Sequence, residues 1–363
     1  MAIQNIVQIF EEEGEVRLLN LLRSFGIKTD SISLNRTKFF DIYDIKLSSG
    51  TRSSRIDRVL VDIGMSMSSH CTPRGYPSMK DGVYRLEIQR SEIESPTYDD
   101  VYKTFSKSYY APIAIGRDEF GENLSVDLNS IPNLLVGGTT GSGKSVLLHS
   151  FVLSLLSERA DIHLVDPKMV EFGMYEEFSS VKSLSNSVEE TEDTIEALRG
   201  IMEKRFSILK RGGSRSVVEY NMKNPSKDYL KPIVLIVDEW ADIVLQKKSI
   251  QKSLCFIAQK GRAAGISIIL ATQRPSASVI SGLVKANFPG RIAMKVASAV
   301  DSRVILDKKG AEELTDVGTG LYLDGRVSSP ILFRAPFIKD VGIELSKMNI
   351  SERKKPFWSK IWS

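Results

Sequence analysis

The sequence is poor in the residues that build disulfide frameworks and zinc sites. Its 363 residues include two cysteines, Cys71 and Cys255, and three histidines scattered along the chain. Disulfide-stabilised domains need paired cysteines, and zinc sites need clustered cysteine or histidine ligands. These scarcities argue against both classes, and they favour a reducing cytoplasm as the location of the protein.

Long apolar runs are also missing. A membrane-spanning helix needs about 18 or more consecutive apolar residues. The longest candidate here, Val146–Leu156, is shorter and is interrupted by His149 and Ser150. The first residues also lack the charged-then-apolar layout of a secretory signal. We therefore expect no stable membrane insertion.

Acidic residues are absent between Asp242 and Asp301. This stretch carries nine basic residues, whereas the rest of the chain carries 40 basic and 45 acidic residues. A local basic surface on an acidic body suits contact with a polyanion, although solvated lysines on ordinary helices would give the same count. We call this set the basic block: Lys247, Lys248, Lys252, Lys260, Arg262, Arg274, Lys285, Arg291 and Lys295.

A change of pattern near Ile113 divides the chain. We predict a smaller mixed α+β domain over residues 1–112, a larger domain over 113–340 and a basic tail over 341–363. In the larger part, short apolar segments alternate with helical ones, which is typical of strands buried on both faces of a parallel sheet. The predicted strands are Leu134–Val136, Ile162–Val165, Ile233–Val237, Ile266–Ala271 and Ile292–Val296.

A phosphate-binding loop follows the first of these strands and precedes an apolar helix. It fits the pattern G-x-x-x-x-G-K-[ST] without exception. Glycines at such a loop let backbone N–H groups converge on phosphate oxygens, and the following helix adds positive potential. The pattern predicts an α/β fold of the RecA-like P-loop NTPase kind, with a mainly parallel central sheet flanked by helices, and ATP as ligand. The loop consists of Gly138, Thr139, Thr140, Gly141, Ser142, Gly143, Lys144 and Ser145.

Catalytic and metal-binding roles can be assigned within this pattern. Lys144 is expected to contact the β- and γ-phosphates, and the Ser145 hydroxyl to bind Mg²⁺. Asp238 and Glu239 follow the apolar strand Ile233–Val237, at the sheet edge where α/β folds bind ligands. We expect Asp238 to hold Mg²⁺ through water and Glu239 to act as general base on the attacking water. A strand-end pair that merely caps a helix is the alternative.

Other polar residues follow neighbouring strands. Gln273 comes directly after Ile266–Ala271 and Thr272, and could contact the γ-phosphate or the attacking water, or simply form a polar turn. Asp166 and Lys168 could border the same site or form a structural turn. An arginine from a neighbouring copy would neutralise transition-state charge. The first candidate is Arg262, and Arg303 is the second.

The phosphate loop, the strand-end carboxylates and several other motifs resemble those of the FtsK/SpoIIIE family of DNA translocases, and they follow one another along the chain in the order found in that family. The resemblance covers roughly residues 113–335, and a weaker similarity to the family's α-subdomain extends upstream. Trp240 stands where the family usually has Phe, and Thr315–Gly320 loosely replaces a Gly-Met-Gly-Asp segment. The motifs lie in Gly137–Ser145, Val165–Lys168, Val237–Asp242, Arg262–Gly265, Ala271–Pro275, Gly282–Asn287, Asp301–Asp307 and Gly310–Glu312.

The resemblance implies a homo-oligomeric ring, a hexamer by analogy, that moves double-stranded DNA at the cost of ATP. It implies DNA contacts from loops that face the pore, for which Lys285, Arg274 and Lys260 are the candidates. The family's membrane helices and C-terminal winged-helix domain find no counterpart in this sequence, so we expect the motor part alone, encoded by a plasmid, phage or integrative element.

Two other functions fit the same motifs. One is a ring ATPase that pumps single-stranded DNA or protein, of the conjugative or secretion type. The other is a nucleotide-switched DNA-binding adaptor that recruits a relaxase or recombinase. The intact pair Asp238 and Glu239 favours hydrolysis over the adaptor.

Overall fold

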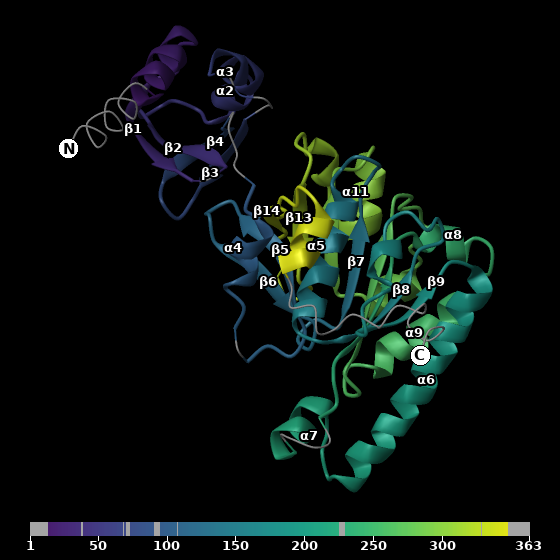
Figure 1. Cartoon of the computed structure of the whole chain (residues 1–363). Coiled ribbons are helices and arrows are strands. Elements are labelled where there is room, and N and C mark those ends of the chain that lie inside the picture. The colour runs from purple at the N-terminus through teal and green to yellow at the C-terminus, as the bar shows by residue number, and fades with distance from the viewer. Residues whose placement is uncertain are drawn as a thin grey trace. The chain divides into compact units, whose positions relative to one another are not determined.

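The chain folds into two compact units, each with its own hydrophobic core (Figure 1). One unit comprises residues 1–94 with 119–122, and the other comprises 95–118 with 123–363. The computed structural model describes residues 14–37, 39–67, 69, 73–90, 95–106, 108–224, 229–327 and 329–347.

The smaller unit contains an antiparallel sheet and helices, where the sequence predicts a mixed α+β domain without specifying the strand pairing. Its strand order is β1-β2-β4-β3, and residues 14–24 are helical. The apolar pattern from Ile56 to Ile63 predicts one helix, but the structure has two short ones, because the chain leaves helical geometry at Val59. The elements are β1 (Thr29–Arg36), β2 (Phe40–Leu47), α2 (Ser54–Asp57), α3 (Leu60–Ser66), β3 (Arg74–Ser78) and β4 (Val83–Gln89).

The larger unit is built on a ten-stranded sheet of order β6-β5-β14-β13-β12-β7-β11-β10-β8-β9. Along this sheet order, each neighbouring pair from β12 to β9 is parallel, and each neighbouring pair from β6 to β12 is antiparallel. Every residue of β7, β10 and β11 is buried, as expected for strands covered on both faces. The strands are β5 (Pro112–Asp118), β6 (Asn123–Asp127), β7 (Asn133–Gly137), β8 (Asp161–Val165), β9 (Val181–Ser185), β10 (Ile233–Val237), β11 (Ile266–Thr272), β12 (Gly290–Met294), β13 (Thr319–Leu323) and β14 (Ile331–Arg334).

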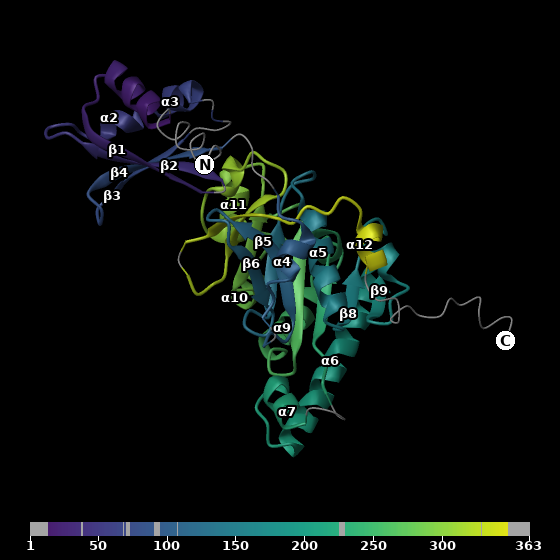
Figure 2. The ribbon, with the colours of Figure 1, turned by 60° about the vertical axis from the view of Figure 1, so that its left-hand side comes forward.

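Helices cover both faces of this sheet. The connections β7–α5–β8 and β10–α9–β11 cross the sheet in opposite directions, so right-handed crossovers place α5 and α9 on opposite faces. Helix α6 packs beside α9, and α4 and α12 pack on the α5 side (Figure 2). The helices are α4 (Tyr98–Tyr102), α5 (Lys144–Ser157), α6 (Val188–Arg211), α7 (Val217–Lys223), α8 (Trp240–Val244), α9 (Ile250–Lys260), α10 (Gly282–Asn287), α11 (Ala299–Leu306) and α12 (Val341–Lys347).

The domain boundaries differ from those that the sequence predicts. The division lies between residues 94 and 95 rather than at 112, because Tyr98 and Val101 of α4 are buried in the core of the larger unit. The predicted tail begins with α12, whose Leu345 is buried in that same core. Residues 348–363 of the predicted tail lie outside the described residues.

Candidate nucleotide site

The phosphate-binding loop joins β7 to α5 at the carboxyl edge of the parallel strands. Backbone N–H groups of Gly138 and Thr139 donate to Thr272 O and Lys295 O, which fixes the loop to the ends of β11 and β12. Gly143 has φ 99°, and a Cβ there would lie 2.9 Å from the backbone nitrogen of Gly318. A side chain at position 143 is therefore excluded by both backbone conformation and space.

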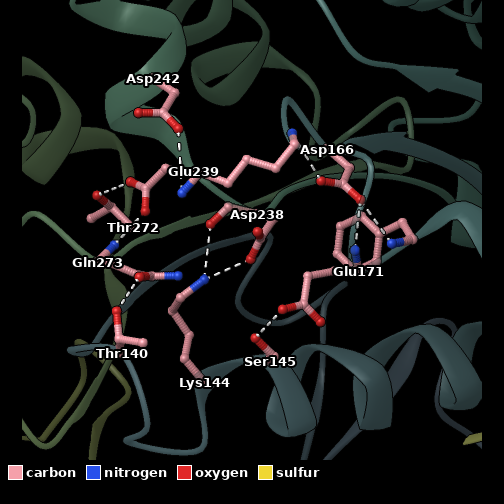
Figure 3. Close-up of polar contacts among 12 residues, drawn as sticks. Thr140, Lys144, Ser145, Asp166, Glu171, Asp238, Glu239, Asp242, Thr272 and Gln273 are labelled. Atoms are coloured by element: carbon pink, nitrogen blue, oxygen red, sulfur yellow. Dashed lines mark hydrogen bonds and ion pairs between the residues drawn. The ribbon is translucent and has the colours of Figure 1, made fainter.

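Lys144 and Asp238 form a buried ion pair inside the site (Figure 3). The Lys144 ammonium donates to Asp238 Oδ1 over 2.6 Å and to the Asp238 carbonyl oxygen over 3.0 Å. Lys144 begins α5 and Asp238 follows β10, so two separate strand ends supply the pair. The structure thus brings together the expected phosphate ligand and an expected metal ligand.

Ser145 contacts a carboxylate that the sequence motifs do not reveal. Its hydroxyl donates to Glu171 Oε1 over 2.8 Å, and His149 Nε2 lies 3.4 Å from Glu171 Oε2. The hydrogen bond from His149, with that from Ser145, lowers the pKa of Glu171 against the opposing effect of burial. The helical spacing of Ser145 and His149, i and i+4, is the only sequence signal for this cluster.

Glu239 lies buried at the end of β10, with hydrogen-bond donors on both carboxylate oxygens. Thr272 Oγ1 donates to Oε1 over 2.5 Å, the backbone N–H of Ala241 donates to Oε1 over 3.3 Å, and that of Gln273 donates to Oε2 over 2.8 Å. Thr140 of the loop donates to the Gln273 side-chain oxygen over 2.6 Å. Figure 3 shows that this network joins the ends of β10 and β11 to the loop.

Asp166 has a structural role at the end of β8. Its fully buried carboxylate accepts from the backbone N–H groups of Lys168, Glu171 and Phe172, which fixes the following loop. Lys168 Nζ lies 3.6 Å from Asp242 Oδ2, near the site. Of the two alternatives, the turn therefore describes Asp166, and through that turn it places Glu171 beside Ser145.

Arg262 and Lys260 precede the first residue of β11, so they lie at the amino ends of the parallel strands. The phosphate loop lies at the opposite, carboxyl ends. Arg262 Nε donates to the Asn129 carbonyl oxygen over 3.1 Å, and Lys260 Nζ lies 4.2 Å from the centroid of the Phe256 ring. Arg303 is exposed on α11. Arg262 is thus remote from the phosphate loop of its own chain.

The two remaining DNA-contact candidates differ in their surroundings. Arg274 is exposed directly after the site residue Gln273. Lys285 on α10 donates to Asp307 Oδ1 over 2.6 Å, and Arg291 pairs with the other oxygen of Asp307. With Lys247, which pairs with Glu192, three cations of the basic block therefore already face a carboxylate.

The donor set at the loop fits a hard divalent cation. The Ser145 hydroxyl and the Asp238 carboxylate supply oxygen, the ligand type that Mg²⁺ prefers, and the Glu171 carboxylate accepts the hydrogen of Ser145. The Ser142 hydroxyl in the same loop is buried and has no hydrogen-bond partner. Within the described part of the chain, no three His, Cys, Asp or Glu residues form a metal cluster, and no helix has the length and apolar character needed to cross a membrane.

Comparisons with known proteins agree with this geometry. The FtsK/SpoIIIE family matches residues 102–277. The DNA translocase FtsK of Rickettsia typhi (strain ATCC VR-144 / Wilmington) is 33% identical over 389 residues, covering 94% of this chain and 51% of the relative. The DNA translocase FtsK of Campylobacter jejuni subsp. jejuni (strain 81-176) is 33% identical over 353 residues, covering 93% and 37%. The chain thus spans about half of these relatives or less.

Solved structures confirm the predicted fold. The pCW3 conjugation coupling protein TcpA, in its monomer form with ATPgS, has a TM-score of 0.67 at 25% identity, covering 93% of this chain and 99% of TcpA. The cytoplasmic domain of the Thermomonospora curvata type VII secretion ATPase EccC has a TM-score of 0.62 at 23% identity, covering 71% and 33%. The fold is that of a P-loop ATPase. With the phosphate loop, the strand-end carboxylates and these relatives together, the chain belongs to the FtsK/SpoIIIE family.

Proposed function

We propose that the chain hydrolyses ATP and uses the energy to move double-stranded DNA through a ring of its own copies, most simply a hexamer. The geometry of Glu239 is the observation that carries the hydrolytic part. Its buried carboxylate is fixed by Thr272 and by the backbone of Gln273 at the sheet edge that also holds Lys144. Such a carboxylate is suited to orient and deprotonate an attacking water.

Magnesium binding is part of the proposal. Ser145 and Asp238 would hold the cation, with Glu171 beside Ser145. Held there, Mg²⁺ would neutralise negative charge that develops on the phosphate oxygens. Lys144 would exchange its contact with Asp238 for the β- and γ-phosphates, and the N–H groups of the loop would bind the same oxygens.

DNA as the partner is supported by the names of the relatives and by the basic block. Arg274 follows the site residue Gln273 directly, and its backbone N–H donates to Thr272 Oγ1. A DNA phosphate bound by Arg274 would therefore be linked through adjacent residues to the part of the site expected to hold the γ-phosphate. Lys285 and Lys260 are further proposed contacts. Since Arg262 is remote from its own phosphate loop, a role in catalysis requires a neighbouring copy. Arg303, which is exposed on α11, is the alternative candidate.

The test measures ATP turnover and movement separately. We expect linear duplex DNA to raise turnover, and we expect the protein to displace a triplex-forming strand from duplex DNA when ATP is present. Glu239→Gln should bind nucleotide and yet do neither, because it lacks the base. Turnover that does not respond to duplex DNA at low salt would contradict the translocase.

A second function is favoured by the likeness to TcpA over 93% of the chain. TcpA is named a conjugation coupling protein, which is consistent with a motor that pumps single-stranded DNA. Single-stranded and duplex DNA of equal length, compared as stimulators of ATP turnover, separate the two functions. Stronger stimulation by the single strand would replace our first proposal with the second.

A further inference from the structure

We propose that Glu171 is a positioning residue that orients the Ser145 hydroxyl toward Mg²⁺. This inference rests on the proposed nucleotide site, and it adds a residue that the P-loop and strand-end motifs do not contain. Glu171 lies in the loop after β8, whereas Ser145 lies in the first turn of α5. In Figure 3 the two side chains face each other, at 2.8 Å between Glu171 Oε1 and Ser145 Oγ.

The loop that carries Glu171 is held in place by hydrogen bonds to the Asp166 carboxylate. The fully buried Asp166 carboxylate accepts from the backbone N–H groups of Glu171 and Phe172, both over 2.9 Å. Phe172 is itself fully buried in the core. The backbone position of Glu171 is therefore set by the fold rather than by its own side-chain contacts.

The second oxygen of Glu171 is held from α5. His149 Nε2 lies 3.4 Å from Glu171 Oε2, and His149 Nδ1 lies 2.8 Å from the hydroxyl of the buried Tyr175. Ser145 and His149 are spaced i and i+4, so they lie on one face of α5 and reach the same carboxylate. Tyr175, His149 and Glu171 thus form a chain of contacts that ends at the Ser145 hydroxyl.

This arrangement has a direct chemical consequence. A hydroxyl has one hydrogen to donate and two lone pairs to offer. When the Ser145 hydrogen is directed to Glu171, both lone pairs of its oxygen remain for a cation, and the carboxylate makes that oxygen more basic. Carboxylates that orient metal ligands in this way typically contribute 10- to 100-fold in metal affinity.

The test compares nucleotide affinity with and without the metal, using a fluorescent ATP analogue. Glu171→Ala should weaken binding about 10-fold or more in excess Mg²⁺ and leave binding in EDTA unchanged. Glu171→Gln should lose less, since its amide oxygen still accepts the Ser145 hydrogen. Glu177→Gln, a change at an exposed carboxylate of the same connection between β8 and β9, is the matched control and should behave as the wild type.

A double-mutant comparison separates positioning through Ser145 from an independent effect. If Glu171 acts through Ser145, then Glu171→Ala should cost nothing further in a Ser145→Ala background. Additive losses, or a Glu171→Gln loss as large as that of Glu171→Ala, would overturn the positioning role. If the nucleotide affinity of the wild-type protein is the same with and without Mg²⁺, the proposed function is overturned instead. Failure of the positioning role and failure of the proposed function therefore give different results.

Discussion

The Lys144 ammonium lies 2.6 Å from Oδ1 of Asp238, and the two side chains are 2% and 4% exposed. A buried charge that loses its partner is destabilising, because no water replaces the lost interaction. The same two groups are our proposed ligands for phosphate and for Mg²⁺. Nucleotide binding would therefore separate the pair, and each charge would gain a ligand of opposite sign.

Lys144→Ala should remove ATP binding and also destabilise the folded chain. It leaves the buried Asp238 carboxylate without its cation, which we expect to lower the free energy of unfolding by about 3 kcal/mol. Urea denaturation in the absence of nucleotide measures this change. Adding Asp238→Asn to the variant should restore much of the loss, because it removes the unpaired charge. A variant as stable as the wild type would contradict the buried pair.

Thr272→Val should slow ATP turnover without weakening nucleotide binding. The substitution keeps the shape of the side chain but removes the hydroxyl that donates to Glu239 Oε1 over 2.5 Å. A hydrogen bond to a charged group is worth roughly 1.5–3 kcal/mol, so we expect about a 10- to 100-fold loss in kcat and an almost unchanged KM. Steady-state phosphate release measures both constants.

The control for this prediction is Thr272→Ser, which keeps the hydroxyl and should retain most of the turnover. A Thr272→Val enzyme with wild-type kcat would show that Glu239 needs no support from β11. An equal loss in both variants would point to packing at position 272 instead of the hydrogen bond.

The parts of the fold that sequence predicts well are those set by local pattern. Strands β7, β10 and β11 are mostly apolar and are buried along their whole length, and their predicted positions agree with the structure to within about a residue. The phosphate loop is defined by its own glycines. Strand β9 (Val181–Ser185) is not predicted from the sequence. It is the edge strand of the sheet, and its residues are a mixture of buried and exposed ones, so it has no continuous apolar run.

The parts that sequence does not predict depend on contacts between distant segments. Glu171 reaches Ser145 across 26 residues of chain, and no spacing rule relates the two positions. Lys285 meets Asp307 in the same way, so the basic block overstates the free positive charge on that surface. Composition counts charges, but only the fold shows which of them are already paired.

Arg274→Ala should weaken DNA binding and reduce its dependence on salt. Arg274 is exposed, and none of the ion pairs among the described residues includes it. For duplex DNA, each phosphate contact contributes about 0.9 to the slope of log affinity against log salt, so the slope should fall by about that amount. Fluorescence anisotropy of a labelled duplex at several salt concentrations measures it.

Two variants complete the salt experiment. Lys204→Ala, a change at an exposed residue of α6 outside the basic block, should leave the slope unchanged. Lys285→Ala should change it less than Arg274→Ala, because Asp307 already neutralises Lys285. Equal slopes for Arg274→Ala and the wild type would remove Arg274 from the proposed DNA surface.

His163→Gln should flatten the acid side of the stability curve. His163 is 7% exposed on β8, and burial lowers its pKa to about 4, with Asp161 opposing this shift and Lys182 adding to it. Between pH 6.5 and pH 4 the unfolded chain therefore binds a proton that the folded chain does not. Stability is full above about pH 6.5 and falls toward pH 4, by roughly 3 kcal/mol from this residue. Urea midpoints for both proteins over that range should converge with falling pH, whereas parallel curves would refute a neutral, buried His163.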